Sequence, residues 1–198
     1  MTDYSLENAA RERGALYVCG TDEAGRGPLA GAVFAAAVIL PPGLEYLGLD
    51  DSKKLSEKRR SDLSDEIKRL AVSWRIESVS AAEIDRINIL NAAMLAMRKA
   101  VAGLDPAPDH VLVDGNRYPG TGLREEPVVK GDARSVSIAA ASILAKVARD
   151  EYMKELDAAY PQYCFAKHKG YPTALHYEKL REFGPCPEHR LTFLKKMH

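Results

Sequence analysis

"LYVCGTDEAGRGPLAGAVFAAAVIL", residues 16–40, holds two apolar runs separated by an acidic pair and a glycine-rich turn. The first run, residues 16–22, predicts a buried strand that ends in Asp22, with Glu23 directly after it. Residues 32–40 predict a second strand, which ends at a pair of prolines. The connection between them is too short for a parallel crossover, so we expect the two strands to pair antiparallel.

The sequence beyond this pair alternates between helix and strand patterns. Ser56 precedes an amphipathic pattern and predicts a capped helix, and residues 72–80 alternate like a half-buried strand. Residues 81–102 predict helical turns and then a longer helix, residues 110–115 (HVLVDG) a short strand, and residues 135–159 a long helix. The last forty residues predict only short helices, separated by proline and glycine.

This order of elements predicts an α/β fold with a mixed sheet flanked by helices and followed by a C-terminal helical region. We expect one domain over residues 1–159, with residues 160–198 packed on it as helices. A chain of 198 residues, 46% of them hydrophobic, is long enough to bury one core of useful size.

The composition excludes several classes of protein. Lys plus Arg equals Asp plus Glu at 28 each, so net charge gives no argument for a nucleic-acid partner. The apolar stretches are too short for a membrane helix, and the N-terminus lacks an apolar signal core. The three cysteines are scattered, which argues against a disulfide framework and against a thiolate zinc site. We therefore expect a soluble cytoplasmic protein that does not associate with membranes.

Four acidic residues follow apolar runs beside glycine: Asp22, Glu23, Asp114 and Asp132. Ligands gather at the strand ends of open α/β sheets, so these carboxylates are candidates for one site. Four carboxylates at one edge would repel one another unless cations lay between them. Oxygen-rich sites of this kind suit Mg²⁺ or Mn²⁺ and support metal-assisted phosphoryl chemistry.

Each acid also has a simpler interpretation. Asp114-Gly115 is typical of a turn, and Asp132 is a natural acid at the start of a helix. The Asp22-Glu23 pair is harder to explain that way. Neighbouring side chains on a strand point to opposite faces, so one of the two should point inward or into a cleft.

The turn Gly25-Arg26-Gly27 matches neither a Walker phosphate loop nor a dinucleotide fingerprint. Its glycines would let the backbone approach a ligand closely, and Arg26 would contact a phosphate through its planar guanidinium. The alternative is a tight hairpin with an exposed arginine.

Two basic stretches predict contact with a nucleic-acid backbone. DSKKLSEKRR contains Lys53 and Lys54, and FAKHKGYPTALHYEK contains His168, Lys169 and Tyr171. Basic clusters with an interleaved aromatic residue suit phosphates and a stacked sugar or base. Alternatively, both are solvated surface. The residues alone favour a structural or surface role over a catalytic one for each histidine of the C-terminal region.

Seven segments together resemble a known family. They are GTDEAGRGPLAGAV, DSKKLSEKRR, NILNAAMLAM, VLVDGN, VVKGDARSVSIAAASILAKVARD, YPQYCFAKHKGYPT and GPCPEHRLTF. In this order they resemble bacterial ribonuclease HII, a type 2 ribonuclease H, from about Val18 to Phe193. The resemblance implies a ribonuclease H-like sheet and endonucleolytic cleavage of the RNA strand of an RNA–DNA hybrid. It also implies incision on the 5′ side of a single ribonucleotide in duplex DNA, leaving 5′-phosphate and 3′-hydroxyl ends.

The resemblance also implies roles for single residues. The four acids would hold two Mg²⁺ or Mn²⁺ ions, one activating a water and the other stabilising the leaving 3′ oxygen. The backbone of Gly25, Arg26 and Gly27 would sense the ribose 2′-hydroxyl at an RNA–DNA junction. Tyr171, or alternatively Tyr163, would stack on the adjacent deoxyribose.

The substrate would be an RNA–DNA hybrid, or a DNA duplex that contains ribonucleotides, bound by a monomer. Lys53 and Lys54 would grip the duplex from one side, and the loop from His168 to Tyr171, with Lys169, from the other. Two rival functions stay open: a non-catalytic nucleic-acid-binding module, and a different metal nuclease of the same fold class.

Overall fold

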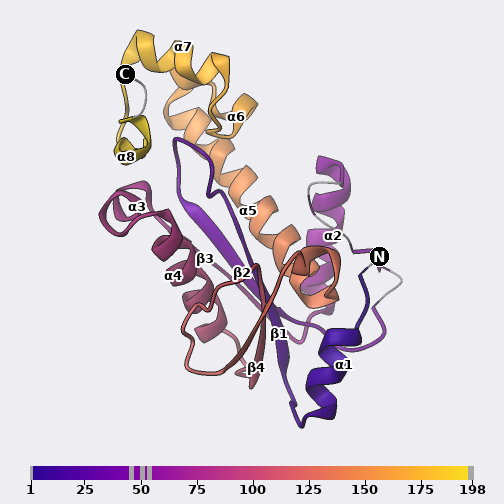
Figure 1. The fold of residues 1–198 in the computed structure, drawn as a ribbon. Coiled ribbons are helices and arrows are strands. Elements are labelled where there is room, and N and C mark those ends of the chain that lie inside the picture. Colours follow the sequence, from indigo (N-terminus) through magenta and orange to yellow (C-terminus); the bar gives the residue numbers. More distant parts are fainter. Residues whose placement is uncertain (1, 45–46, 50–51, 53–54, 196–198) are drawn as a thin grey trace.

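The computed structural model describes residues 2–44, 47–49, 52 and 55–195. Its strands form one five-stranded sheet in the order β3-β2-β1-β4-β5 (Figure 1). In chain order the helices and strands are α1 (Ser5–Glu12), β1 (Val18–Ala24), β2 (Val33–Ile39), α2 (Glu57–Leu70), β3 (Ser73–Val79), α3 (Ala81–Ile87), α4 (Ile89–Ala102), β4 (His110–Asp114), β5 (Arg124–Val128), α5 (Val136–Ala159), α6 (Phe165–His168), α7 (Ala174–Phe183) and α8 (Leu191–Leu194).

The sheet is mixed, as the sequence predicts. β1 and β2 pair antiparallel, with Cys19 opposite Ile39 and Ala24 opposite Phe34. β1 pairs parallel with β4, and β4 pairs parallel with β5. The carboxyl ends of β1, β4 and β5 therefore meet at one edge of the sheet.

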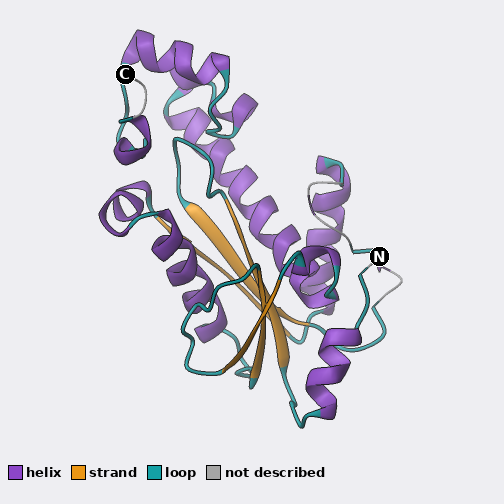
Figure 2. Cartoon of the chain, viewed as in Figure 1, coloured by secondary structure: helices purple, strands orange, loops and turns teal. Residues whose placement is uncertain are grey.

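Helices cover both faces of this sheet (Figures 1 and 2). On one face, α2 and α5 share a core with β2, and on the other α4 shares a core with β1, β2 and β4. α5 lies very close to β1, because a Cβ atom placed on Gly20 would stand 2.2 Å from the backbone carbon of Ser137. Only glycine permits that approach, which places α5 beside the end of β1.

The predicted Ser56 cap forms, and Ser135 caps a second helix that the sequence analysis left without a named cap. The Ser56 side chain accepts a hydrogen bond from the Arg59 N–H at the start of α2, and Ser135 accepts one from the Ile138 N–H at the start of α5. Asp132 lies before this cap, in a 3₁₀ turn over Gly131–Ala133, so it is not the capping residue of the long helix.

Two elements are absent from the sequence prediction. β5 (Arg124–Val128) lies where the sequence analysis expects no strand, because this stretch is charged and contains Pro127. Such a strand is tolerated because β5 is the last strand of the sheet. The second element is α1, whose buried Glu7 accepts hydrogen bonds from the Ser135 hydroxyl (2.6 Å) and the Ser137 N–H (2.9 Å).

The C-terminal helices pack on the end of α5 and on the loop after β1. A shared apolar cluster contains Ala30, Met153, Tyr163 and Phe165. The boundary at residue 159 remains a prediction. Within the described ranges, no helix has the length and apolar character needed to span a bilayer.

Candidate active site

Three of the four predicted acids line one cavity at the carboxyl end of the sheet. Thr21 on β1 lies opposite Val113 on β4, so the next residues along these strands are Asp22 and Asp114. Both of these acids and Glu23 line a cavity of about 300 Å³. The parallel pairing of two strands thus brings together acids that are far apart in the sequence.

The electrostatics of this cavity disfavour negative charge. Asp22 is only 4% exposed, and burial together with the charges of Glu23 and Asp114 raises its pKa well above the usual value. Burial also raises the pKa of Glu23, although Arg26, 3.1 Å away, acts in the opposite direction. Ser142 on α5 hydrogen-bonds to Asp22 and favours its charged form. The folded protein therefore holds carboxylates whose repulsion a cation would relieve.

Asp132 lies beside this group without lining the cavity. The Asp114 Oδ1 atom accepts hydrogen bonds from the Gly131 N–H (2.7 Å) and the Asp132 N–H (3.4 Å). Asp132 itself is 8% exposed, and it is not among the residues that line the cavity. Its assignment as a fourth ligand remains a prediction.

The donor chemistry of the cavity fits a divalent cation. Within the described ranges, no three or more His, Cys, Asp or Glu side chains gather closely enough to enclose a metal ion by themselves. Mg²⁺, however, commonly binds one or two carboxylates and takes its other ligands from water and substrate phosphates. Asp22, Glu23 and Asp114 offer such oxygens, and burial together with mutual repulsion favours a cation among them.

The glycine-arginine turn forms the adjoining wall of the same cavity, where Gly25, Arg26 and Gly27 all line it. Gly25 has a φ of +99°, and a Cβ atom there would lie 2.1 Å from Nε of Arg149. Arg26 keeps about half of its side chain exposed while it pairs with Glu23. The turn therefore presents exposed backbone at Arg26 and Gly27, and one half-exposed guanidinium, beside the carboxylates.

Two buried arginines, which the sequence analysis did not single out, hold this turn in place. Arg190, fully buried, donates to the carbonyl oxygens of Gly25 (2.7 Å), Arg26 (3.1 Å), Pro28 (2.9 Å) and Gly31 (2.9 Å). Its partners lie about 160 residues away in the sequence, so no local pattern would identify it.

Arg149 on α5 supports the next part of the turn. It donates to the carbonyl oxygens of Ala30 (3.3 Å), Ala32 (3.4 Å) and Lys169 (3.0 Å). It therefore ties the loop after β1 to the C-terminal region, which brings Tyr171 to the cavity.

Tyr171, and not Tyr163, has its ring at the cavity. Tyr171 is 40% exposed and lines the cavity, with the Arg149 guanidinium 5.8 Å from its ring centre. A Cβ atom on Gly27 would lie 3.6 Å from its ring. Tyr163 is buried, stacks on Phe165 and donates its hydroxyl proton to a carbonyl oxygen, so its ring is not available to a substrate.

One predicted contact residue needs correction. His168 is buried, its Nδ1 accepts a hydrogen bond from the Gly170 N–H, and its Nε2 donates to the Tyr163 carbonyl oxygen. Both ring nitrogens are thus hydrogen-bonded inside the protein, so the buried ring is not placed to touch a duplex. Lys169 remains partly exposed. Lys53 and Lys54 lie outside the described residues, so their contacts stay predictions.

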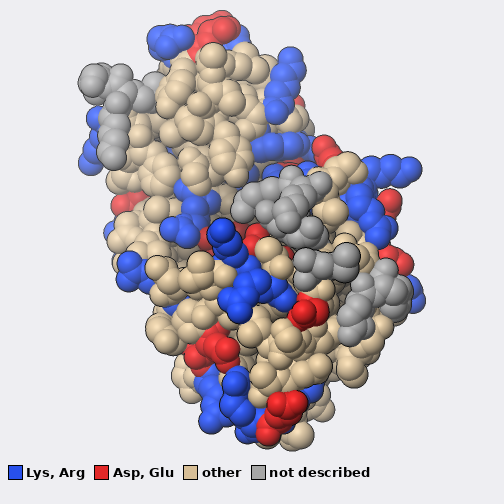
Figure 3. All heavy atoms as spheres, turned by 45° about the vertical axis from the view of Figure 1, so that its right-hand side comes forward, with Lys and Arg blue, Asp and Glu red and all other residues tan. Residues whose placement is uncertain are grey.

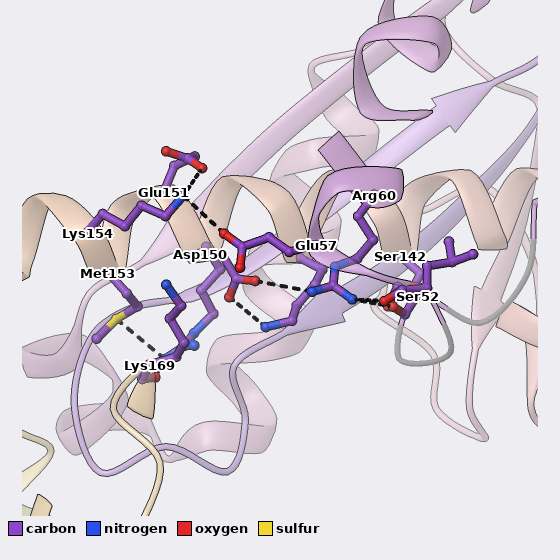
Figure 4. A network of polar contacts seen from close by, with 12 residues as sticks. Ser52, Glu57, Arg60, Ser142, Asp150, Glu151, Met153, Lys154 and Lys169 are labelled. Atoms are coloured by element: carbon purple, nitrogen blue, oxygen red, sulfur yellow. Dashed lines mark hydrogen bonds and ion pairs between the residues drawn. The ribbon is translucent and has the colours of Figure 1, made fainter. Parts of the chain in front are cut away.

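Part of the basic stretch that runs into the start of α2 is structural. Arg59 donates to the Leu47 carbonyl oxygen (3.0 Å), and Arg60 donates to that of Ser52 (2.9 Å). Figure 4 shows Arg60 directed toward both Ser52 and Asp150, 3.9 Å from the Asp150 carboxylate. In Figure 3, Lys and Arg side chains gather beside a recess in which acidic atoms are visible.

Comparison with known proteins agrees with this geometry. The sequence profile of ribonuclease HII matches residues 19–198. Ribonuclease H2 from Pyrococcus horikoshii OT3 is 27% identical, with a TM-score of 0.75 over 89% of this chain and 93% of that one. Ribonuclease HII from Archaeoglobus fulgidus, solved in complex with PCNA, is 28% identical, with a TM-score of 0.77 over 89% and 94%.

A third structure, Bst-RNase HIII in complex with Mn²⁺, shares the fold at 22% identity. Its TM-score is 0.69 over 89% of this chain and 65% of that one. The mixed sheet with flanking and C-terminal helices is therefore the ribonuclease H-like fold that the sequence predicts. The profile match spans nearly the whole chain, and this chain belongs to the ribonuclease HII family, whose members are ribonuclease H hydrolases acting on RNA paired with DNA.

Proposed function

We propose that this protein is an endonuclease that cuts the RNA strand of RNA–DNA hybrids and cuts duplex DNA on the 5′ side of a single ribonucleotide. The products would carry 5′-phosphate and 3′-hydroxyl ends. One observation carries the proposal: a single cavity is lined by Asp22, Glu23 and Asp114, by the turn Gly25–Gly27, and by Tyr171. Groups suited to phosphate chemistry thus lie beside groups suited to recognising a sugar.

The proposed cofactor is a pair of divalent ions, Mg²⁺ or Mn²⁺, held by Asp22, Glu23 and Asp114 with Asp132 beside them. When bound, such ions lower the pKa of a nucleophilic water and stabilise the leaving 3′ oxygen. The burial of Asp22 and its repulsion from two neighbouring carboxylates support this assignment. The Mn²⁺ in Bst-RNase HIII, a protein of the same fold, is consistent with it.

The chain's own residues would select the substrate. The exposed backbone of Gly27, in the turn that also lines the cavity with Gly25 and Arg26, would permit close approach of a sugar, and a 2′-hydroxyl could both donate and accept hydrogen bonds there. The exposed Arg26 would pair with a phosphate once a duplex competes for its ion pair with Glu23. The exposed Tyr171 ring would stack on the deoxyribose that follows the ribonucleotide.

Two other functions make different predictions. A non-catalytic binding module needs basic loops but no cluster of acids, and the carboxylates at the centre of this cavity weigh against it. A nuclease for DNA junctions would cut DNA regardless of ribonucleotides. The monomeric state and cytoplasmic location expected from the sequence remain predictions.

The test compares three duplexes of one sequence: all DNA, DNA with a single ribonucleotide, and an RNA–DNA hybrid. In Mg²⁺ or Mn²⁺ the wild type should cut the last two and leave the first intact, and EDTA should abolish cutting. Asp114→Asn should bind the hybrid yet lose cleavage. Cutting of all-DNA duplex, or wild-type cleavage rates in Asp114→Asn, would overturn the proposal.

A further inference from the structure

Three buried histidines lie directly behind the loop that carries Tyr171. His168 ends α6, His176 lies on α7, and His189 follows α7 in the chain. The rings of His168 and His176 stack with their centres 4.2 Å apart, and those of His176 and His189 are 5.3 Å apart. None of the three is more than 7% exposed. Because all three rings are buried, they cannot act by touching the substrate.

Hydrogen-bond chemistry fixes the direction of the contacts in this group. The Cys186 backbone N–H only donates, so Nδ1 of His189, 2.9 Å away, is the acceptor. A neutral His189 then carries its proton on Nε2, which faces Nε2 of His176 at 3.1 Å. His176 accepts there, carries its own proton on Nδ1, and donates it to the Tyr171 carbonyl oxygen at 3.0 Å. A single directed chain therefore runs from Cys186 to Tyr171.

This chain requires both rings to be neutral. A second proton on His176 would set two N–H groups against each other at 3.1 Å. Burial lowers the pKa of both His176 and His189 to about 4, and the stacked His168 acts in the same direction on both. The arrangement therefore persists at neutral pH.

The chain ends on the residue whose ring lines the cavity. The Tyr171 carbonyl oxygen also accepts the Thr173 N–H (2.8 Å), and the Tyr171 N–H donates to the His168 carbonyl oxygen (2.9 Å). The preceding carbonyl, that of Gly170, accepts the Leu29 N–H at 2.8 Å and so docks this loop against the turn after β1. With its backbone held from both sides, Tyr171 has a defined place beside Gly27.

We propose that His176 and His189 act together as positioning residues for Tyr171, and that they thereby set the preference for a ribonucleotide followed by deoxyribose. Neither ring touches the substrate. The role rests on the function proposed above, because it acts through the stacking of Tyr171. Substrate preference would then depend on two buried rings behind the cavity wall as well as on the residues that line the cavity.

The first test reads the protonation of the rings and needs no activity. Nitrogen-15 chemical shifts at neutral pH should show His176 with its proton on Nδ1, and His189 and His168 with theirs on Nε2. Substitution of each histidine in turn assigns the signals. A His176 ring protonated on Nε2, or one that averages between tautomers, would overturn the directed chain.

The second test measures cleavage. His176→Phe keeps a ring against His168 but removes both hydrogen bonds, whereas His176→Asn keeps an amide donor near the position of Nδ1. His110→Phe is the matched control, since His110 is buried on β4, where its Nε2 contacts Glu126 at 3.2 Å. Tyr171→Ala gives the pattern expected when the ring itself is lost.

His176→Phe should lower kcat/KM on the single-ribonucleotide duplex by about tenfold and on the continuous hybrid by about threefold or less. His176→Asn should recover most of the loss, and His110→Phe should affect both substrates equally. Equal losses on both substrates in folded His176→Phe, or no recovery in His176→Asn, would refute the positioning role. If the wild type cut neither substrate, the proposed function would fail, while the tautomers would still test the directed chain.

Discussion

Replacing Gly25 by alanine tests how the turn beside the carboxylates is held. The residue has a φ of +99°, and the new Cβ atom would lie 2.1 Å from Nε and 2.4 Å from Cδ of Arg149. Arg149 is 1% exposed and packed on every side, so it has little room to withdraw. The substitution must displace either the turn or the arginine.

The expected loss in the free energy of unfolding has two parts. A side chain in the left-handed region costs about 1–2 kcal/mol. Displacing Arg149 endangers its three hydrogen bonds to backbone carbonyls, at roughly 1 kcal/mol each. If all three hydrogen bonds are lost, we expect Gly25→Ala to lower the free energy of unfolding by about 4–5 kcal/mol.

Gly14→Ala separates the two parts. Gly14 has a φ of +95°, and no atom lies within 4 Å of its added Cβ. Equilibrium urea unfolding should give about 1–2 kcal/mol for this control, and the smaller unfolded-state entropy of alanine cancels in the comparison. In an Arg149→Ala background, Gly25→Ala should cost no more than Gly14→Ala. Equal losses for the two glycines in the wild-type background would refute the reasoning.

Three further predictions concern the carboxylates, the buried rings and the recognition residues. Mn²⁺ at ten times its Kd should stabilise the wild type against thermal unfolding by about 1.4 kcal/mol, and Asp22→Asn should lose most of this stabilisation. Equal stabilisation of the two proteins by Mn²⁺ would show that the ion binds elsewhere. The pKa of His176 falls from 6.5 to about 4 on folding, so the unfolded chain binds the extra proton between these values and stability is lost as pH falls from 6.5 to 4. The free energy of unfolding should fall by on the order of 3 kcal/mol over this range. Urea unfolding should therefore depend more steeply on pH in the wild type than in His176→Phe, and the same pH dependence in both proteins would contradict the prediction. Arg26→Ala and Tyr171→Ala should weaken cleavage at a lone ribonucleotide more than cleavage of a long hybrid; equal losses would argue against their recognition roles.

Local patterns in the sequence predict much of this fold because they depend on near neighbours. Ser56 caps its predicted helix through a contact three residues away, and the apolar runs around Asp22 and Asp114 form the predicted strands. The convergence of these two acids follows from parallel strand ends. β5 escaped prediction because a charged strand with a proline is tolerated only at a sheet edge, and edge position is a property of the whole sheet.

The support of the site depends on contacts between distant parts of the chain. Arg190 reaches carbonyl groups near residues 25–31, and a lone arginine near the C-terminus gives no sign of such partners. His168 is in a basic, polar stretch that is typical of a surface loop, yet the packing of Phe165 and His176 around it buries the ring. Exposure in such a segment is decided by tertiary packing, which sequence composition does not encode.

The central claim is that Asp22, Glu23 and Asp114 hold the divalent ions that support cleavage. Anomalous scattering from a crystal of the wild-type protein with Mn²⁺ and a single-ribonucleotide duplex, cut or uncut, tests this directly. We predict Mn²⁺ peaks in the cavity lined by these carboxylates, next to the phosphate 5′ of the ribonucleotide. A cleavage-competent complex with Mn²⁺ bound only elsewhere would contradict the account.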